Sequence, residues 1–200
     1  MANHVNGYLS VHQISEEGQK VWDEYVVGTL EKSRGIGGSA YDTHLGYFIF
    51  ESDDEGEFTN WDFSTMCDEV GAKWAYAEDF DECGISMTSA WSPCLPFCEM
   101  IAQKIAEVDP SVQLVLTYED EFPNFVGVAT FSKGGMDNDD YIQWDGLRSI
   151  MIEENEDLAV LWNEDEEEWT DDDAAFDILC DVKWDVIAEW QQSNICWSVS

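Results

Sequence analysis

Positive charge is what this 200-residue sequence has least of. Eight Lys and Arg side chains stand against 44 Asp and Glu, which gives a formal net charge of -36. Proteins that hold nucleic acid through its phosphates need clustered basic side chains, and an anionic membrane surface would repel so acidic a chain. The composition therefore predicts a basic protein as partner, with no direct binding of nucleic acid or membrane.

Long apolar runs are also missing. No stretch reaches the roughly eighteen consecutive apolar residues that would mark a membrane-spanning helix. The first residues, MANHVNGYLSV, lack the charged region and apolar stretch of a secretory signal. We therefore expect the protein to stay in the cytoplasm in which it is made.

Motifs of catalysis and cofactor binding are absent from the sequence. It contains no G-x-S-x-G, no H-E-x-x-H and no dinucleotide-binding glycine motif, and its three histidines are His4, His12 and His44. The GIGG segment within residues 32–43 lacks the GxxxxGK[ST] frame of a phosphate-binding loop and is read as a plain loop. We expect no enzyme activity and no cofactor.

Metal ligands in a recognisable frame are missing as well. The acid pairs at 53–54 and 139–140 lack a Ca²⁺-loop pattern, although an enzyme with carboxylate-bound Mg²⁺ stays an alternative. Cys94 and Cys98 have no CxxC partner pair, so no structural zinc is expected. The six cysteines are read as reduced, buried thiols.

Aromatic residues, by contrast, are plentiful. Ten Trp, ten Phe and seven Tyr accompany a hydrophobic fraction of 44%. Disordered acidic tails are poor in aromatics, so this composition predicts a folded body with a substantial core.

The order of periodic segments predicts an α+β fold. Ser15 offers a helix N-cap, Ser92 and Pro93 begin a second helix, and Asp109-Pro110 ends it. Alternating or apolar runs predict strands at 5–11, 73–78, 84–89, 112–119 and 125–132, while 45–50 is a further strand or part of an insertion. This order favours a ferredoxin-like antiparallel sheet with helices on one face, interrupted by a loop or insertion at 32–60.

Three segments of this first part carry a resemblance to a known family: Gly71 to Trp74 (GAKW), Ala90 to Pro93 (AWSP) and Thr117 to Ala129 (TYEDEFPNFVGVA). With the opening MANHVNGYLSV they resemble the YubB/Api92-like family of ferredoxin-like proteins from phages and conjugative plasmids. Ala72 and Cys94 depart from the family pattern. The resemblance covers about residues 1–135 and implies the fold and an origin on a mobile element, but no mechanism.

The remaining residues, 136–200, are predicted to form an acidic extension that packs on this domain through Leu158, Val160, Leu161 and a helix. Thr170 is the expected N-cap of that helix, and its apolar stripe ends at Trp190. Residues 163–185 nevertheless hold eleven carboxylates and one lysine. Because like charges repel, so many acids in one segment should destabilise the fold unless they serve a function.

Five of these acids recur at every fourth position of the predicted helix, which places them about 6 Å apart along its axis. This spacing is comparable to that of successive phosphates along one nucleic-acid strand, whereas a merely solvated helix face would normally mix in lysine. We interpret the segment as a nucleic-acid mimic that occupies the basic cleft of a nucleic-acid-binding host protein, for example a defence nuclease. The candidate partner-binding residues are Glu164, Asp165, Glu166, Glu167, Glu168, Asp173, Asp177, Asp181, Asp185 and Glu189.

Two other interpretations of the acidity stay open. Salt adaptation also yields acid-rich, lysine-poor surfaces, although ten Trp run against the usual trimming of large apolar side chains. An acidic chaperone or assembly factor for a basic protein would use the same electrostatics with less demand on shape. The target and the oligomeric state are not predicted.

Overall fold

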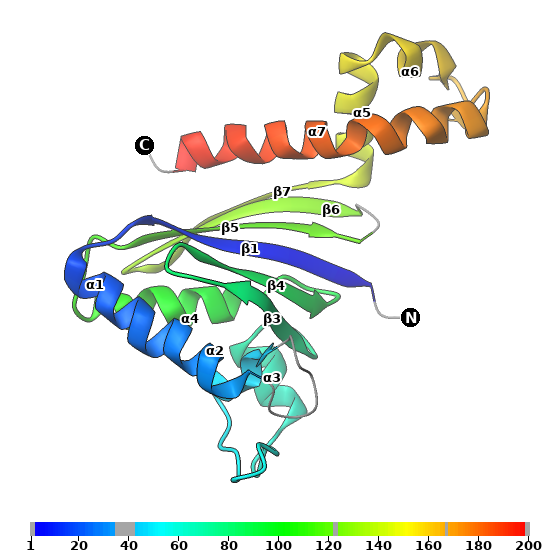
Figure 1. The fold of residues 1–200 in the computed structure, drawn as a ribbon. Coiled ribbons are helices and arrows are strands. Elements are labelled where there is room, and N and C mark those ends of the chain that lie inside the picture. Colours follow the sequence, from blue (N-terminus) through cyan, green and yellow to red (C-terminus); the bar gives the residue numbers. More distant parts are fainter. Residues whose placement is uncertain (1–2, 35–42, 122–123, 167, 199–200) are drawn as a thin grey trace.

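A single seven-stranded antiparallel sheet organises the chain (Figure 1). The computed structural model describes residues 3–34, 43–121, 124–166 and 168–198. The strand order is β2-β3-β4-β1-β5-β6-β7. The strands are β1 (His4–Gln13), β2 (Thr43–His44), β3 (Ala75–Phe80), β4 (Gly84–Ala90), β5 (Gln113–Asp120), β6 (Phe125–Ser132) and β7 (Gly135–Gln143). With the helices on this sheet, the predicted α+β class is confirmed.

Helices from the first two thirds of the chain cover one face of the sheet (Figure 1). They are α1 (Glu16–Val21), a π-helical segment (Trp22–Val27), α2 (Gly28–Ser33), α3 (Phe63–Glu69) and α4 (Leu95–Ala106). Ser15 caps α1 as predicted, because its Oγ accepts a hydrogen bond from Gly18 N at 3.2 Å. Fully buried Trp22, Leu30 and Phe97 join the inward residues of the strands in the main core.

Helix α7 (Asp172–Ser198) covers part of the opposite face, with α5 (Trp144–Glu154) and α6 (Glu156–Leu161) beside it at one end (Figure 1). A short hairpin, β8 (Trp162–Asn163) and β9 (Glu168–Trp169), links α6 to α7. These elements share a second apolar cluster with Val126 of β6. Leu158 is buried there and Leu161 packs against it, but Val160 is 81% exposed, so its predicted packing role was wrong.

The acidic segment 137–140, which the sequence assigned to the acidic extension, forms part of strand β7 of the main sheet. Asp139 and Asp140 pair with Ala129 and Val128 of β6. β7 is an edge strand with one neighbour, and edge strands accept charged side chains that a central strand would exclude. The domain boundary expected near residue 135 falls at the first residue of this strand.

Two further local predictions are corrected. The second helix begins at Leu95 rather than at Ser92-Pro93, because the chain first turns at Trp91, which has a positive φ of 66°. The run 45–50 forms a 3-10 helix at Leu45–Phe48 and no strand. The predicted loop at 32–43 falls mostly on residues 35–42, which lie outside the described residues.

The described thiols are free but are not uniformly buried. Cys94 and Cys98 are buried, and burial raises the pKa of the Cys94 thiol to about 12. Cys83 and Cys180 are exposed, one in the β3–β4 turn and one on the solvent side of α7, so the prediction of burial was wrong for them. Within the described ranges, no helix is both long and apolar enough to cross a bilayer.

Removing a buried contact of α7 should destabilise the protein measurably. Ile187 is 3% exposed in the second cluster, and Ile187→Ala should lower the free energy of unfolding by about 2 to 5 kcal/mol. Phe176→Ala on the same helix is the control, because Phe176 is 65% exposed, and it should cost less than about 0.5 kcal/mol. Urea unfolding of both variants measures this, and equal losses would contradict the observed orientation of α7.

Acid should remove a stabilising contribution of His44. Its Nδ1 accepts a hydrogen bond from Gly46 N at 2.9 Å, and burial lowers the pKa of His44 from 6.5 to about 4. The folded state therefore binds fewer protons than the unfolded state below pH 6.5, and this stabilisation is lost as the pH falls towards 4. In His44→Asn, an oxygen can still accept the bond but cannot titrate in this range. Between pH 7 and pH 5 the wild type should lose about 2 kcal/mol relative to this variant in paired urea titrations. Parallel pH profiles would show that His44 is not buried in its neutral form.

Candidate functional site

Helix α7 carries half of the residues that the sequence marks as a candidate partner-binding surface. Its first turn is capped by Asp171, whose Oδ1 accepts a hydrogen bond from Ala174 N at 3.1 Å. Thr170, the predicted cap, instead donates its N–H and its hydroxyl to Leu161 O at 2.8 and 3.1 Å. The cap prediction was wrong because Thr170 is used to close the β8–β9 hairpin.

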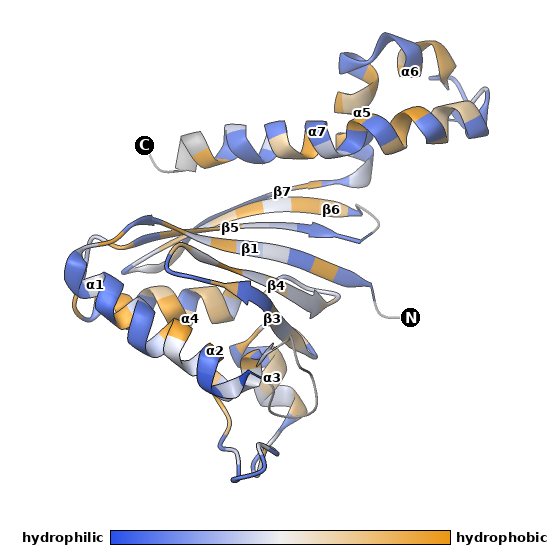
Figure 2. Ribbon diagram, viewed as in Figure 1, coloured by the Kyte–Doolittle hydropathy of each residue, from blue (hydrophilic) through white to orange (hydrophobic). Residues whose placement is uncertain are grey.

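The inner face of α7 is apolar and holds the helix in place. Ala175, Leu179, Val186 and Ile187 are buried in the second cluster, where they pack with residues of α5, α6 and β6. Farther along, Gln191 Nε2 donates a hydrogen bond to Tyr118 O of β5 at 3.3 Å. Hydrophilic and hydrophobic residues consequently alternate along α7 (Figure 2). The helix is therefore fixed to the sheet, and its outer side is left to solvent.

The five acids that recur at every fourth position are all exposed on α7. We call this row the file; it consists of Asp173, Asp177, Asp181, Asp185 and Glu189. A step of four residues advances about 6 Å and turns the helix about 40° beyond one full turn. From its first to its last carboxylate the file thus runs about 24 Å and winds about 160° around the helix. Among the described residues, none of the five forms an ion pair or accepts a hydrogen bond.

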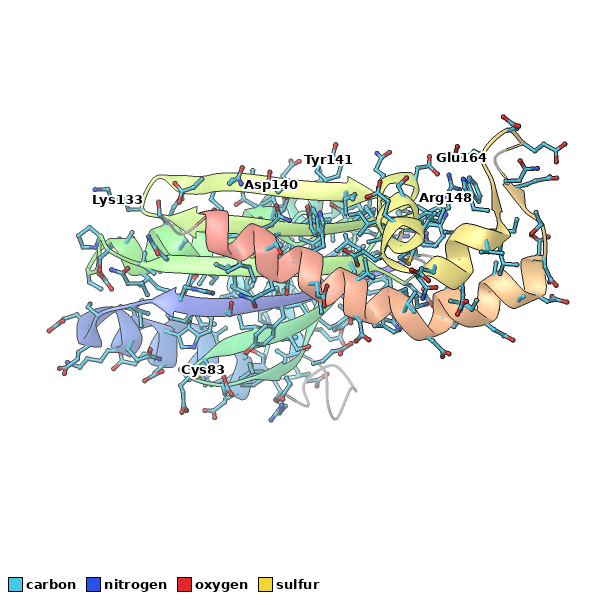
Figure 3. The ribbon with its side chains drawn as sticks, turned by 90° about the horizontal axis from the view of Figure 1, so that it is seen from above. Cys83, Lys133, Asp140, Tyr141, Arg148 and Glu164 are labelled. Carbon is cyan, nitrogen blue, oxygen red and sulfur yellow. The ribbon has the colours of Figure 1, made fainter. Side chains whose placement is uncertain are left out.

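The second group of candidate acids lies on the β8–β9 hairpin, which leads directly into α7. Glu164, Asp165, Glu166 and Glu168 are exposed, whereas Glu167 lies outside the described residues. Trp162 and Trp169 pair across the hairpin with ring centroids 4.9 Å apart. Glu164 lies at one end of the molecule, beyond the strands of the main sheet (Figure 3). The structure therefore places the hairpin acids at the N-terminal end of the file and not along its side.

Basic side chains do little to neutralise this surface. Between residues 144 and 198 the sequence has seventeen carboxylates, but only Arg148 and Lys183 are basic. The Arg148 guanidinium lies 4.6 Å from the centroid of the Trp162 ring and pairs with Asp145 at 3.2 Å. The Lys183 ammonium lies 4.8 Å from the Trp184 ring centroid. Both cations are occupied by contacts outside the file.

A groove of about 170 Å³ joins the file to the end of α5. Its apolar residues come from both helices, and its carboxylates belong to Asp185 and Glu189 of the file and to Glu154 of α5. The groove is lined by Met151, Glu154, Asn155, Val182, Asp185, Val186 and Glu189. Glu154 was not among the predicted residues, because it lies far from the file along the chain. A signal was present, since Glu154 is an acid in the last turn of a helix, where the dipole disfavours negative charge.

Exposed carboxylates and one groove are the features of this surface. The described residues contain no group of three or more His, Cys, Asp or Glu side chains that could hold a metal ion. Comparisons with protein-family models, curated proteins and solved structures find no match to this chain. The function must therefore be argued from the acidic surface itself.

Neutralising the file should stabilise the fold. Replacing Asp173, Asp177, Asp181 and Asp185 by Asn and Glu189 by Gln removes four like-charge contacts of about 0.2 to 0.5 kcal/mol each. Loss of the favourable charge of Asp173 in the first turn offsets part of this gain. The net increase in unfolding free energy should be about 1 kcal/mol at an ionic strength of about 0.01 M, and it should shrink at about 1 M. Thermal melts at both salt concentrations measure it, and a variant that melts below the wild type would disprove the repulsion.

Proposed function

We propose that this protein is a nucleic-acid mimic that inhibits a nucleic-acid-binding protein by occupying its basic cleft. The observation that carries the proposal is the winding file on α7. Its five exposed carboxylates lie about 6 Å apart, have no ion-pair partner among the described residues, and stand on a helix whose other side is buried. A protein gains no stability from such a row, because neighbouring like charges repel. A complementary basic surface would compensate that repulsion on binding.

The charge density supports mimicry. A helix of 27 residues is about 40 Å long. Six carboxylates lie on α7 itself, Asp172 and the five of the file, which is about one per 7 Å of helix length. Double-stranded DNA carries one phosphate per about 1.7 Å of its axis. Residues 144–171 add eleven more carboxylates. A basic cleft shaped for DNA would therefore meet a dense negative surface on a folded support, without bases and without a scissile bond.

The proposal includes the ferredoxin-like fold and the phage or plasmid origin that were expected from the sequence. Strand order β3-β4-β1-β5, with two helical segments on one face, supports a ferredoxin-like domain to which β6, β7 and the acidic extension are added. We propose membership of the YubB/Api92-like family and hence a phage or plasmid origin. The target would then be a host protein of the same cytoplasm, such as a defence nuclease. The inhibitor acts by binding, without catalysis of its own.

The proposal is tested by finding the partner and competing it against DNA. The tagged protein is used to capture basic proteins from a bacterial lysate, and retained proteins are eluted with a salt gradient. The partner should be a nucleic-acid-binding protein that the wild type displaces from labelled DNA, with association that slows steeply as salt rises. The five-fold file variant should compete at least about tenfold less well, while Asp181→Asn alone should lose about twofold.

A matched control separates the file from net charge. Glu16, Glu17, Asp23, Glu24 and Glu31 are five exposed acids on the helices of the opposite face. Their replacement by Gln and Asn changes the net charge by the same amount and should leave competition within about twofold of the wild type. If both five-fold variants lose equally, the interaction is diffuse, as for an acidic assembly factor. If no captured protein releases DNA, the mimic function is rejected.

Salt dependence distinguishes mimicry from salt adaptation. A mimic that works in an ordinary cytoplasm should be folded at about 0.1 M salt, and its melting temperature should level off once the Debye length falls below the spacing of the file. A salt-adapted protein would need molar salt to fold. Circular dichroism melts across this range measure the difference, and unfolding at about 0.1 M salt would favour adaptation.

A further inference from the structure

The groove between α5 and α7 combines an apolar base with an acidic border. Met151 and Val186 are buried and Val182 is partly buried, whereas Glu154, Asp185 and Glu189 are exposed. The three acids come from two helices, so their juxtaposition exists only in the folded protein. The groove therefore offers one ligand both an apolar and an anionic contact.

The size of the groove limits what it can hold. Its volume of about 170 Å³ exceeds that of several waters, each of which takes about 30 Å³ in the liquid. Pockets for drug-sized ligands begin at about 300 Å³. A nucleotide or a folded peptide segment would extend beyond the groove, and one long side chain is the unit that fits within it.

The negative charge around the groove favours a positively charged ligand. The C-terminal end of a helix carries a partial negative charge from its unpaired carbonyls, and α5 ends at this groove with Glu153 and Glu154 in its last turn and no basic residue there. The carbonyls and the carboxylates repel one another in the isolated protein, and a bound positive charge would relieve this repulsion. Arg148 and Lys183, the two bases of the region, are engaged with tryptophan rings.

We propose that this groove receives the side chain of an arginine from the partner protein. The inference rests on the proposed function and gives it a specific anchoring site. The methylene stem of arginine would lie on partly buried Val182, above the buried Met151 and Val186, and its guanidinium would reach the border carboxylates. Arginine suits this place better than lysine because its guanidinium has five donors and is more weakly hydrated than an ammonium group.

The test uses short peptides in place of the unidentified partner. The full chain is labelled at its methionine methyl groups, and the Met151 signal is followed by NMR at low salt. The probes are capped Gly-Arg-Gly, Gly-Lys-Gly and Gly-citrulline-Gly. The arginine peptide should shift Met151 saturably, the lysine peptide should bind several-fold more weakly, and the neutral citrulline peptide should have no effect. Equal affinity for lysine would overturn the choice of arginine, and an unshifted Met151 signal would overturn the site.

Two triple variants supply the matched control. Glu154→Gln, Asp185→Asn and Glu189→Gln together should weaken arginine-peptide binding about tenfold. Asp173→Asn, Asp177→Asn and Asp181→Asn remove the same charge from the other end of the file and should change the affinity less than about twofold. Equal weakening by both would mean diffuse attraction and no groove site. Val182→Phe keeps every charge, fills the groove and should abolish the Met151 shift, with circular dichroism confirming the fold.

The same variants separate failure of this inference from failure of the proposed function. If the groove triple displaces the partner from DNA as well as the wild type does, the arginine site is wrong while mimicry stands. If no DNA-binding partner exists but the arginine peptide still binds at Met151, the groove is confirmed as an arginine site and the mimic function is wrong.

Discussion

Burial of the inner face of α7 is the interaction on which the acidic surface depends. Four like-charge contacts along the file cost about 1 to 2 kcal/mol in total. Burying Leu179, Val186 and Ile187 contributes about 1.5 to 3 kcal/mol for each side chain. Packing therefore exceeds repulsion several-fold, and the helix forms in spite of its charge. An isolated peptide with this sequence would have no such compensation.

This arrangement divides the protein into two faces with different roles. On one face, α1, α2 and α4 close a conventional core over the sheet. On the other, the second cluster fixes a charged helix whose carboxylates are left without partners in the described part of the chain. The main core thus lies on the face opposite the file, so a change in the charge of α7 leaves the main core untouched.

The packed helix also holds the acids at fixed positions, which would make a mimic selective for one basic surface. A disordered acidic tail attracts basic proteins through charge alone and must be ordered on binding, which costs conformational entropy. Here the acids are already fixed at helical spacing, and Gln191 ties the far half of α7 to β5. The groove adds a contact for a single side chain within this otherwise repetitive surface. The repeated charges would attract the partner and speed its association, and the groove would fix its position along the file.

Much of this could be predicted from the sequence because it depends on local periodicity. Alternation predicted β1, and Ser15 predicted the start of α1, since a cap bonds within its own turn. The apolar stripe that ends at Trp190 was sufficient to predict α7 and thus to place the file on a single helix. The strand β7 was missed, because its hydrophilic sequence is acceptable only at a sheet edge with a single neighbour.

The remaining features depend on contacts between segments that are distant in the sequence. Thr170 has the residue type of a cap, yet it bonds to Leu161 across a hairpin, and the cap falls to Asp171. Glu154 joins Asp185 and Glu189 only because α5 packs against α7. Local patterns determine which side chains share one helix face, since that depends on rotation per residue alone. Which faces meet depends on contacts between residues far apart in the sequence, and no local pattern encodes those contacts.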